Sequence, residues 1–261
     1  RINPQCSTQE GHAIYDPCAP GSRLGTTLAN FDPAQLPLLD GLHMHTLCEQ
    51  DADDLESTVQ ALEAKFGTYL HGLKWLNLGG GHLVTRQGYD VQLLIDVLRD
   101  FHARYPQLHL VLEPGSAFAW QTGPLVSEVV DVVENHGIKT AILNVSFTCH
   151  MPDCLEMPYH PAVRGAETLA DAAERGLDRE PCVYRLGGNS CLSGDYMGCW
   201  RFEKPLQVGD SVIFEDMIHY TTVKTNMFNG IAHPAIKIKC LDGSVQLLRE
   251  FGYADYRDRM D

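Results

Sequence analysis

The apolar positions of the first part of the chain follow a helical period. Across residues 51–66 they recur at intervals of three and four, at Leu55, Val59, Leu62 and Phe66. This spacing predicts an amphipathic helix. Gly67 follows directly, and we expect the helix to end there.

A strand and a second helix follow this first helix. Residues 73–78 form a short apolar run, three glycines come next, and residues 91–101 carry a second apolar helical face that ends before Pro106. Residues 108–112 form another apolar run. Strand, loop, helix and strand in this order are typical of βα units built on a parallel sheet or barrel.

The pattern changes after residues 113–115. Valine-rich and alternating runs occupy residues 126–133 and 141–147, with His136-Gly137 between them, and helical spacing becomes scarce. Residues 236–248 alternate on both sides of Asp242-Gly243, which predicts a β-hairpin. We therefore expect an α/β part over residues 1–120 and an all-β or mainly β part over residues 121–261.

Composition narrows the class of protein. A net charge of -14 argues against nucleic acid and anionic membranes as partners and suits a cationic ligand. Nine cysteines without a CxxC pair favour free thiols in a reducing compartment. Neither a membrane span nor a leader segment is visible, so we expect a cytoplasmic protein with no membrane partner.

Gly79, Gly80 and Gly81 follow a predicted strand and precede a helix. Backbone amides at such a place can bind a phosphate, helped by the helix N-terminus. The segment lacks the GK[ST] of a P-loop and the spacing of a dinucleotide fold. A phosphate site and a plain tight turn both remain open for this segment.

His43 and His45 lie on the same side of a predicted extended segment, and Glu113 ends the last βα strand. The histidine pair suggests a metal, but no further ligand stands at a fitting spacing, so we expect none. We favour an imidazole stacked on a flat cofactor. The carboxylate of Glu113 is either structural or holds a proton on a heterocyclic nitrogen, on the face where barrel enzymes keep their chemistry.

The segment 187–195, GGNSCLSGD, reads as a polar loop that carries Cys191 and Asp195. Buried cysteines are usually inert packing, but the neighbours of Cys191 cannot bury it. A thiol on such a loop suits a proton donor, and a carboxylate suits a cation. The other cysteine-containing segment of note, TCHMPDC at 148–154, lacks the second half of a zinc site.

Seven ordered motifs resemble the fold type III decarboxylases that use pyridoxal 5'-phosphate, and most closely their carboxynorspermidine and carboxyspermidine branch. The motifs are YDPCAPGSRLG at 15–25, GLHMHTLCEQ at 41–50, NLGGGHL at 77–83, EPG at 113–115, LEMPY at 155–159, GGNSCLSGD at 187–195 and FEDMIHYTTVKTNMFNG at 214–230. The resemblance implies an alanine-racemase-like (β/α) TIM barrel, here without its N-terminal strands, and a C-terminal β-barrel or Greek-key domain.

The resemblance also implies residue roles in binding pyridoxal phosphate. The cofactor-binding residues would be His45, Gly79, Gly80, Gly81, Glu113, Gly115 and Tyr220. The glycine loop and Tyr220 would hold the phosphate, and His45 would stack on the ring. Glu113 would keep the ring nitrogen protonated, which makes the ring an electron sink.

Three further residues would act on the substrate. Cys191 would protonate the carbon that loses carbon dioxide, reaching the site from the partner subunit of a homodimer. Asp195 would bind the distal amine. Glu156 would favour a polyamine chain, because relatives that act on amino acids place a basic residue there. No lysine of this chain matches the family's Schiff-base lysine, so we expect on the order of 90 residues of the barrel upstream of Arg1.

The predicted function is decarboxylation of carboxynorspermidine or carboxyspermidine to norspermidine or spermidine, in polyamine biosynthesis. One alternative keeps the cofactor and takes a diamino acid such as diaminopimelate, lysine or ornithine as substrate. Another is a non-catalytic protein that binds pyridoxal phosphate. Sequence leaves open which polyamine is preferred, since one methylene is worth only about 1 to 3 kcal/mol in a pocket.

Overall fold

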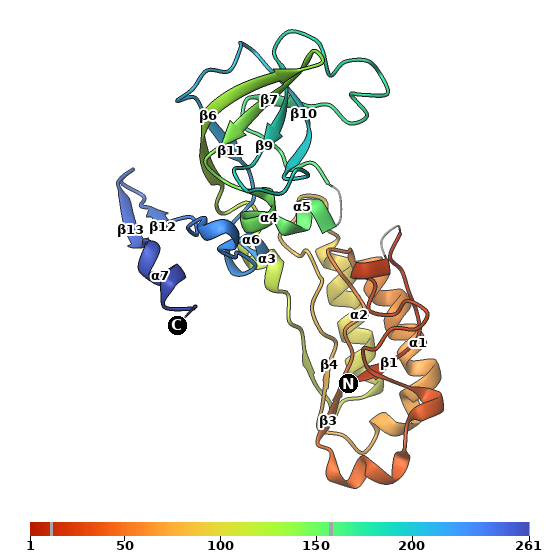
Figure 1. Ribbon diagram of the computed structural model, residues 1–261. Coiled ribbons are helices and arrows are strands. Elements are labelled where there is room, and N and C mark those ends of the chain that lie inside the picture. The colour runs from red at the N-terminus through yellow and green to blue at the C-terminus, as the bar shows by residue number, and fades with distance from the viewer. Residues whose placement is uncertain (11–12, 157–158, 261) are drawn as a thin grey trace. The chain divides into compact units, whose positions relative to one another are not determined.

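The chain folds into two compact units, residues Arg1–Trp120 and Gln121–Asp261. A computed structural model describes residues 1–10, 13–156 and 159–260 (Figure 1). Each unit has its own hydrophobic core. The two units are described separately.

The first unit is built on a parallel sheet of three strands in the order β3-β4-β5. The strands are β3 (Gly41–His43), β4 (Trp75–Asn77) and β5 (His109–Val111). Helices α1 (Ala52–Leu70) and α2 (Val91–Arg104) connect them, and both lie on the same side of the sheet (Figure 1). The predicted strand-helix order is confirmed.

Smaller elements complete the first unit. They are the parallel pair β1 (Ile2–Asn3) and β2 (Thr26–Thr27), the 3-10 helices Ala13–Tyr15, Leu28–Asn30 and Pro33–Leu38, and the short helix α3 (Gly115–Ala119). The core packs the apolar face of α1 against the sheet. Leu55, Val59, Leu62 and Phe66 are all buried there, as their spacing predicts.

The expected end of the first helix at Gly67 is wrong. Helix α1 continues to Leu70, and Gly67 is buried inside it. A Cβ at Gly67 would lie 2.9 Å from the hydroxyl oxygen of Tyr105. The glycine therefore provides room for Tyr105 at the helix surface and does not act as a stop signal.

The second unit contains a sheet of six strands in the order β11-β6-β7-β9-β10-β8. The strands are β6 (Leu125–Asn135), β7 (Ile138–Leu143), β8 (Ala166–Thr168), β9 (Val183–Gly187), β10 (Tyr196–Phe202) and β11 (Ser211–Phe214). All neighbours are antiparallel except β7 and β9. Strands β6 and β7 form a hairpin whose turn residues, His136 and Gly137, both have positive φ.

Short helices lie between and after these strands. They are α4 (Phe147–His150), α5 (Pro152–Glu156), α6 (Tyr220–Val223) and the 3-10 helix Phe228–Gly230. The predicted run 141–147 is a strand only to Leu143. The hydroxyl of Ser146 then accepts a hydrogen bond from the Cys149 N–H at 3.1 Å, and this capping contact starts α4.

The C-terminal segment forms the predicted hairpin, β12 (Ile236–Lys239) and β13 (Val245–Arg249), followed by α7 (Tyr253–Arg257). Gly243 has a φ of 86°, and the side chain of Asp242 accepts the Ser244 N–H at 2.9 Å. These are the contacts expected of a tight Asp-Gly turn.

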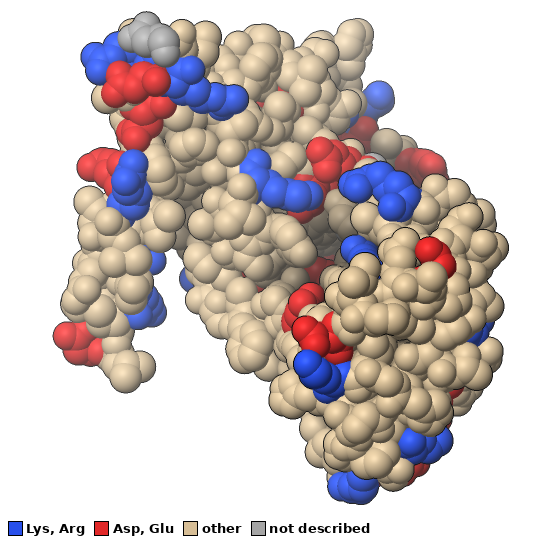
Figure 2. Space-filling model, turned by 90° about the horizontal axis from the view of Figure 1, so that it is seen from below, with Lys and Arg blue, Asp and Glu red and all other residues tan. Residues whose placement is uncertain are grey.

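Charged side chains of both signs are mixed on the surface that Figure 2 shows. On the face drawn in Figure 2, Lys and Arg side chains lie beside Asp and Glu side chains in several places. Ion pairs such as Arg164 with Glu215, at 2.6 Å, account for this mixing. No disulfide joins any two of the nine cysteines, all of which the structure describes. None of the helices over residues 1–10, 13–156 and 159–260 has the length and apolar character required to cross a membrane.

Candidate active site

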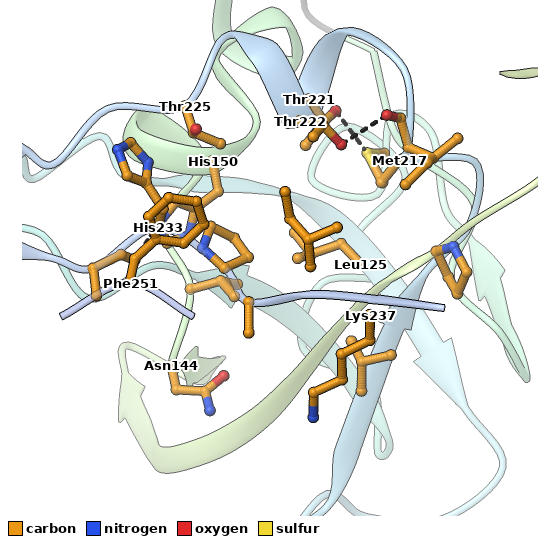
Figure 3. A pocket seen from close by; sticks show the side chains of 18 residues that line it. Leu125, Asn144, His150, Met217, Thr221, Thr222, Thr225, His233, Lys237 and Phe251 are labelled. Atoms are coloured by element: carbon orange, nitrogen blue, oxygen red, sulfur yellow. Dashed lines mark hydrogen bonds between the residues drawn. The ribbon is translucent and has the colours of Figure 1, made fainter. Parts of the chain in front are cut away.

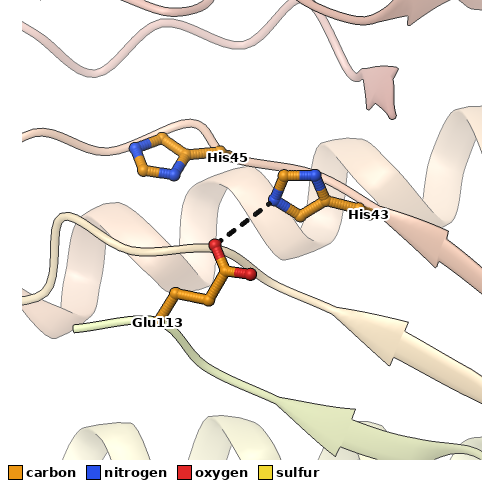
Figure 4. A group of neighbouring side chains, drawn as sticks. All are labelled: His43, His45 and Glu113. Carbon is orange, nitrogen blue, oxygen red and sulfur yellow. Dashed lines mark ion pairs between the residues drawn. The ribbon is translucent and has the colours of Figure 1, made fainter. Parts of the chain in front are cut away.

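The carboxyl ends of the three parallel strands meet at one edge of the first unit. The register pairs His43 with Asn77 and Asn77 with Val111. The residues that follow each strand therefore gather at this edge. The structure brings together three of the groups singled out from sequence, namely His45, the glycine loop and Glu113 (Figure 4).

His45 is held by the glycine loop. The Gly80 N–H donates to Nδ1 of His45 at 3.2 Å. An accepting Nδ1 places the imidazole proton on Nε2, so this contact requires the neutral ring. Burial lowers the pKa of His45, and the charges of Arg1 and His43 lower it further. A neutral, oriented imidazole is the form that can lie flat against an aromatic ring.

Glu113 presents a half-exposed carboxylate at the same edge. Its Oε1 accepts a hydrogen bond from Nδ2 of Asn77 at 2.6 Å, and its Oε2 lies 3.8 Å from Nε2 of His43 (Figure 4). Burial lowers the pKa of His43, against the opposing effect of Glu113. One side of the carboxylate is thus fixed by neighbours, and half of the side chain stays open to a ligand.

The three glycines are required by the close approach of neighbouring backbone. A Cβ at Gly79 would lie 2.5 Å from the Met44 carbonyl oxygen, and one at Gly81 would lie 2.2 Å from that of Leu47. Both glycines also have positive φ. At Gly80 the added Cβ would meet the Glu113 carbonyl oxygen at 2.3 Å, with Cε1 of His45 at 3.4 Å. Gly80 therefore packs directly against the backbone of Glu113 and next to the imidazole of His45.

The structure corrects one argument from sequence, that the histidine pair has no further metal ligand. Atoms of His43, His45 and Glu113 able to bind a metal all lie within 4.8 Å of one another. The third group comes from a distant strand, which sequence spacing could not show. The carboxylate of Glu113 belongs to both arrangements, the possible metal ligands and the predicted partner of a pyridine nitrogen.

Gly115 begins α3 in the first unit. A Cβ there would meet nothing within 4 Å, and its N–H donates to the carbonyl oxygen of Glu113 at 2.8 Å. Its assignment to the cofactor stays a prediction.

Sequence reasoning missed Asn77. Its Oδ1 accepts the Gly79 N–H at 2.8 Å while its Nδ2 holds Glu113. The signal was available, because Asn77 lies near the end of the predicted strand 73–78 and Glu113 follows the next one, and the ends of parallel strands lie at one edge.

The second unit carries the other four predicted site residues. Cys191 is exposed, as expected, and its backbone N–H donates to Oδ1 of Asn229 at 2.9 Å. Asn229 is a second residue that sequence reasoning missed, and no spacing signal connects it with Cys191. The role of Cys191 as a proton donor stays a prediction.

Asp195 is buried, with 4% of its surface exposed. Its Oδ2 accepts from the Ser146 hydroxyl at 2.8 Å and from the Ser190 N–H at 3.1 Å, and its Oδ1 accepts from the Thr148 N–H at 3.1 Å. Such a carboxylate organises the loops around it. Its proposed contact with a substrate amine stays a prediction that these bonds do not require.

Glu156 lies at the end of α5 and is exposed. The ammonium of Lys224 is 4.0 Å from its Oε2 and contacts Asp153 more closely. The hydrogen bond to Asp153 raises the pKa of Lys224. The same ammonium lies 5.7 Å from the ring centre of Tyr220, which is 52% exposed. These groups already hold an alkylammonium ion.

A cavity of about 500 Å³ also lies in the second unit (Figure 3). His150, Thr222, His233 and Lys237 contribute polar groups to its wall. As far as the described residues show, none of the four predicted site residues lines it. It is therefore separate from the groups discussed above.

The sequence matches the family described as "Pyridoxal-dependent decarboxylase, C-terminal sheet domain" over residues 13–218. It is 52% identical over its full length to a carboxyaminopropylagmatine decarboxylase of Synechocystis sp., and 43% identical over 93% of its length to a carboxynorspermidine/carboxyspermidine decarboxylase of Campylobacter jejuni. It covers 65% and 64% of those two proteins, about two thirds of their length.

A solved structure leads to the same family. The crystal structure of carboxynorspermidine decarboxylase from Campylobacter jejuni, complexed with norspermidine, superposes with a TM-score of 0.83 at 42% identity. The match covers 92% of this chain and 65% of that one. The alanine-racemase-like fold expected from sequence is thereby confirmed. From sequence, site geometry and structure together, the chain belongs to the family of pyridoxal-dependent decarboxylases.

Proposed function

We propose that the complete protein is a pyridoxal-phosphate-dependent carboxy-lyase that removes carbon dioxide from a carboxylated polyamine. The observation that carries this proposal is that the neutral imidazole of His45 and the half-exposed carboxylate of Glu113 lie together at one strand edge, with polar atoms of the two side chains within 4.8 Å, beside the glycine loop. A side chain at position 80 would clash with the backbone of Glu113, so the loop has bare backbone there. This arrangement fits a flat, phosphorylated pyridine.

Each residue of this edge has a defined task in the proposal. The imidazole of His45 would lie against the ring, and the carboxylate of Glu113 would accept a hydrogen bond from the ring nitrogen and so keep that nitrogen protonated. The glycine backbone would face the phosphate. Tyr220 belongs to the second unit and not to this edge, and it stays the predicted hydroxyl donor to the phosphate. The bound pyridoxal phosphate supplies the electron sink for the pair of electrons that carbon dioxide leaves behind.

The substrate proposal rests on the relatives and on the acidic groups of the second unit. The two relatives are named for carboxylated polyamines or for a carboxylated aminopropylagmatine. All these molecules carry cationic groups beyond the carboxylate to be removed. Asp153 and Glu156 already accept the ammonium of Lys224, so a cationic chain suits them better than a carboxylate. Carboxynorspermidine or carboxyspermidine is the first candidate substrate.

A second candidate is carboxyaminopropylagmatine, because the relative that acts on it shares 52% identity with this chain. Its guanidinium end could bind a carboxylate in two parallel hydrogen bonds, whereas an ammonium acts as a point charge. The same acidic groups suit either cation. The two candidates therefore differ in the distal group and share the reaction.

The experiment is a comparison of kcat/KM on the complete protein with four substrates: carboxynorspermidine, carboxyspermidine, carboxyaminopropylagmatine and diaminopimelate. We expect kcat/KM for at least one carboxylated polyamine to exceed kcat/KM for diaminopimelate. Glu156→Arg should lower kcat/KM for the polyamines far more than kcat/KM for diaminopimelate. Glu156→Gln is the matched, uncharged control. Diaminopimelate as the best substrate would refute the polyamine proposal, and no decarboxylation of any of the four would refute the enzyme proposal.

The proposed enzyme is a homodimer with shared active sites, in which Cys191 serves the cofactor site of the partner subunit. Cys191→Ala removes the proposed proton donor, and Glu113→Ala removes the proposed partner of the ring nitrogen. If sites are shared, mixing the two inactive variants creates mixed dimers with one complete site, and part of the activity returns. No recovery in mixed dimers would contradict sharing.

A further inference from the structure

The proposed proton donor is held through its backbone by one side chain. Cys191 is exposed, and its N–H donates to Oδ1 of Asn229 at 2.9 Å. The next N–H, that of Leu192, reaches the Ser190 hydroxyl oxygen at 3.3 Å, a contact inside the same loop. The bond to Asn229 is thus the contact that ties the thiol-bearing residue to another part of the unit.

Asn229 has a backbone conformation that few residues adopt. Its φ is 58° and its ψ is 15°, in the left-handed region. Glycine occupies this region freely, and Asn and Asp enter it more readily than other residues do. The position therefore restricts the residue type for a reason separate from the hydrogen bond to Cys191.

The segment that carries Asn229 is itself anchored. The Asn226 side chain donates from Nδ2 to the Thr148 carbonyl oxygen at 3.0 Å, and its backbone N–H donates to that of Cys149 at 2.9 Å. The Phe228 N–H donates to Oδ1 of Asn226 at 3.0 Å. The acceptor of Asn229 is therefore presented from a fixed turn.

Helix α4 also holds the C-terminal end of the loop 187–195, which carries the Cys191 thiol. Asp195 accepts from the Thr148 N–H and from the Ser190 N–H, both at 3.1 Å. The loop is thus fixed at Asp195 and at Cys191 by two contacts that lead back to residues 148–149. Cys191 lies between the end held by Asp195 and the turn held by Asn226.

We propose that Asn229 is a positioning residue for the thiol of Cys191. The inference rests on the proposed function, in which Cys191 returns a proton to the substrate carbon. That carbon's electron pair, left by carbon dioxide, forms the new C–H bond. The electrons of the broken S–H bond stay on sulfur, and the thiolate regains a proton from water.

Position matters for this step because a proton donor must lie within hydrogen-bond reach of the atom that it protonates. A displacement of about 1 Å can cost on the order of 100-fold in rate. Asn229 touches neither substrate nor cofactor in this proposal. It fixes the main chain from which the thiol extends.

The test uses two variants of the complete protein. Asn229→Gly keeps the left-handed backbone and removes the acceptor, whereas Asn229→Asp keeps both. Three quantities are measured: kcat and KM for decarboxylation, cofactor absorbance, and amide hydrogen exchange of the peptide that contains Cys191 in the cofactor-free protein. The exchange measurement needs no activity.

We expect Asn229→Gly to lower kcat about 10- to 100-fold, with KM changed less than about twofold, cofactor absorbance retained, and faster exchange at Cys191. Asn229→Asp should restore most of kcat and the slow exchange. Wild-type exchange in Asn229→Gly would overturn the inference. So would an Asn229→Asp enzyme as slow as Asn229→Gly, because the acceptor would then not be what matters.

A third variant separates this inference from the proposed function. If Cys191→Ala decarboxylates at the wild-type rate, the donor role of Cys191 is wrong and the inference falls with it. If Cys191→Ala is slow and Asn229→Gly is not, only the inference on Asn229 is wrong. A wild-type protein that decarboxylates nothing refutes the proposed function, while hydrogen exchange still decides whether Asn229 holds Cys191.

Discussion

Asn77 joins Glu113 to the glycine loop, donating from Nδ2 to Oε1 of Glu113 at 2.6 Å and accepting the Gly79 N–H on Oδ1 at 2.8 Å. A single amide therefore fixes both the carboxylate proposed for the ring nitrogen and the backbone proposed for the phosphate. Hydrogen bonds to a charged acceptor contribute about 1.5 to 3 kcal/mol. Their loss should be visible in cofactor affinity.

Asn77→Leu keeps the size of the side chain and removes both hydrogen bonds. We expect the dissociation constant for pyridoxal phosphate to rise on the order of tenfold, which corresponds to about 1.4 kcal/mol. Titration of the complete, cofactor-free protein by absorbance measures it. Asn30→Leu, at an exposed asparagine whose side chain donates to the Thr27 hydroxyl at 3.2 Å, is the matched control. Unchanged affinity in Asn77→Leu would contradict the assigned role.

Gly80→Ala tests the close contact between the glycine loop and the backbone of Glu113. The added Cβ would lie 2.3 Å from the carbonyl oxygen of Glu113, which is backbone and cannot swing away. Overpacking of this kind costs roughly 1 to 3 kcal/mol, and the displaced strand end should also weaken cofactor binding at least about tenfold. Gly72→Ala is the control, because its Cβ would meet nothing within 4 Å. Equal effects of the two variants on cofactor affinity would remove Gly80 from the site.

Sequence predicted the elements of this chain better than its contacts. Apolar spacing located α1 and α2, because burial of one face imposes the period. Valine-rich runs located most of β6 and the end of β7, and alternation around Asp242-Gly243 located the C-terminal hairpin, although its strands are mostly exposed. The prediction failed at Gly67, whose small size serves a tertiary contact with Tyr105. A glycine that makes room and a glycine that ends a helix look the same in one sequence.

The candidate site divides in the same way. His45, the glycines and Glu113 could be found because each follows a strand, and parallel strand ends share an edge. The bond between Cys191 and Asn229 could not, since it joins a loop to a turn with no periodic relation. The burial of Asp195 could not be predicted from sequence either, because its hydrogen-bond donors Ser146 and Thr148 lie on a distant segment of the chain.

Asp195→Asn distinguishes a loop-holding carboxylate from a ligand for the substrate amine. Three donors, from Ser146, Thr148 and Ser190, would lose a charged acceptor. We expect the free energy of unfolding of the cofactor-free protein to fall by about 1 to 3 kcal/mol, measured by urea titration. Asp100→Asn, at an exposed position, is the control. Unchanged stability combined with a raised KM for polyamines alone would favour the amine role instead.

Acid should destabilise the protein through two buried histidines, His82 and His150. Burial lowers the pKa of each from 6.5 to about 4. His150 is held neutral, because its Nδ1 accepts from the Ser146 N–H at 3.2 Å and its Nε2 lies 3.1 Å from the Ala232 carbonyl oxygen. Among the described residues, neither ring nitrogen of His82 makes a well-aligned hydrogen bond, although the nearby Gly79 backbone opposes part of the lowering of the pKa.

Between pH 6.5 and about 4 the unfolded chain binds protons at these positions and the folded chain does not. The stabilising effect of the neutral rings is therefore complete above pH 6.5 and is lost as the pH falls through this window, by up to about 1.4 kcal/mol per pH unit for each histidine. His82→Phe removes one of these titrations. In this variant the free energy of unfolding should change less with pH between pH 6.5 and 4.5 than in the wild type. The exposed control His102→Gln should leave this pH dependence unchanged. Urea unfolding across this range measures the slopes, and equal slopes for wild type and His82→Phe would show that His82 takes up its proton in the folded state as well.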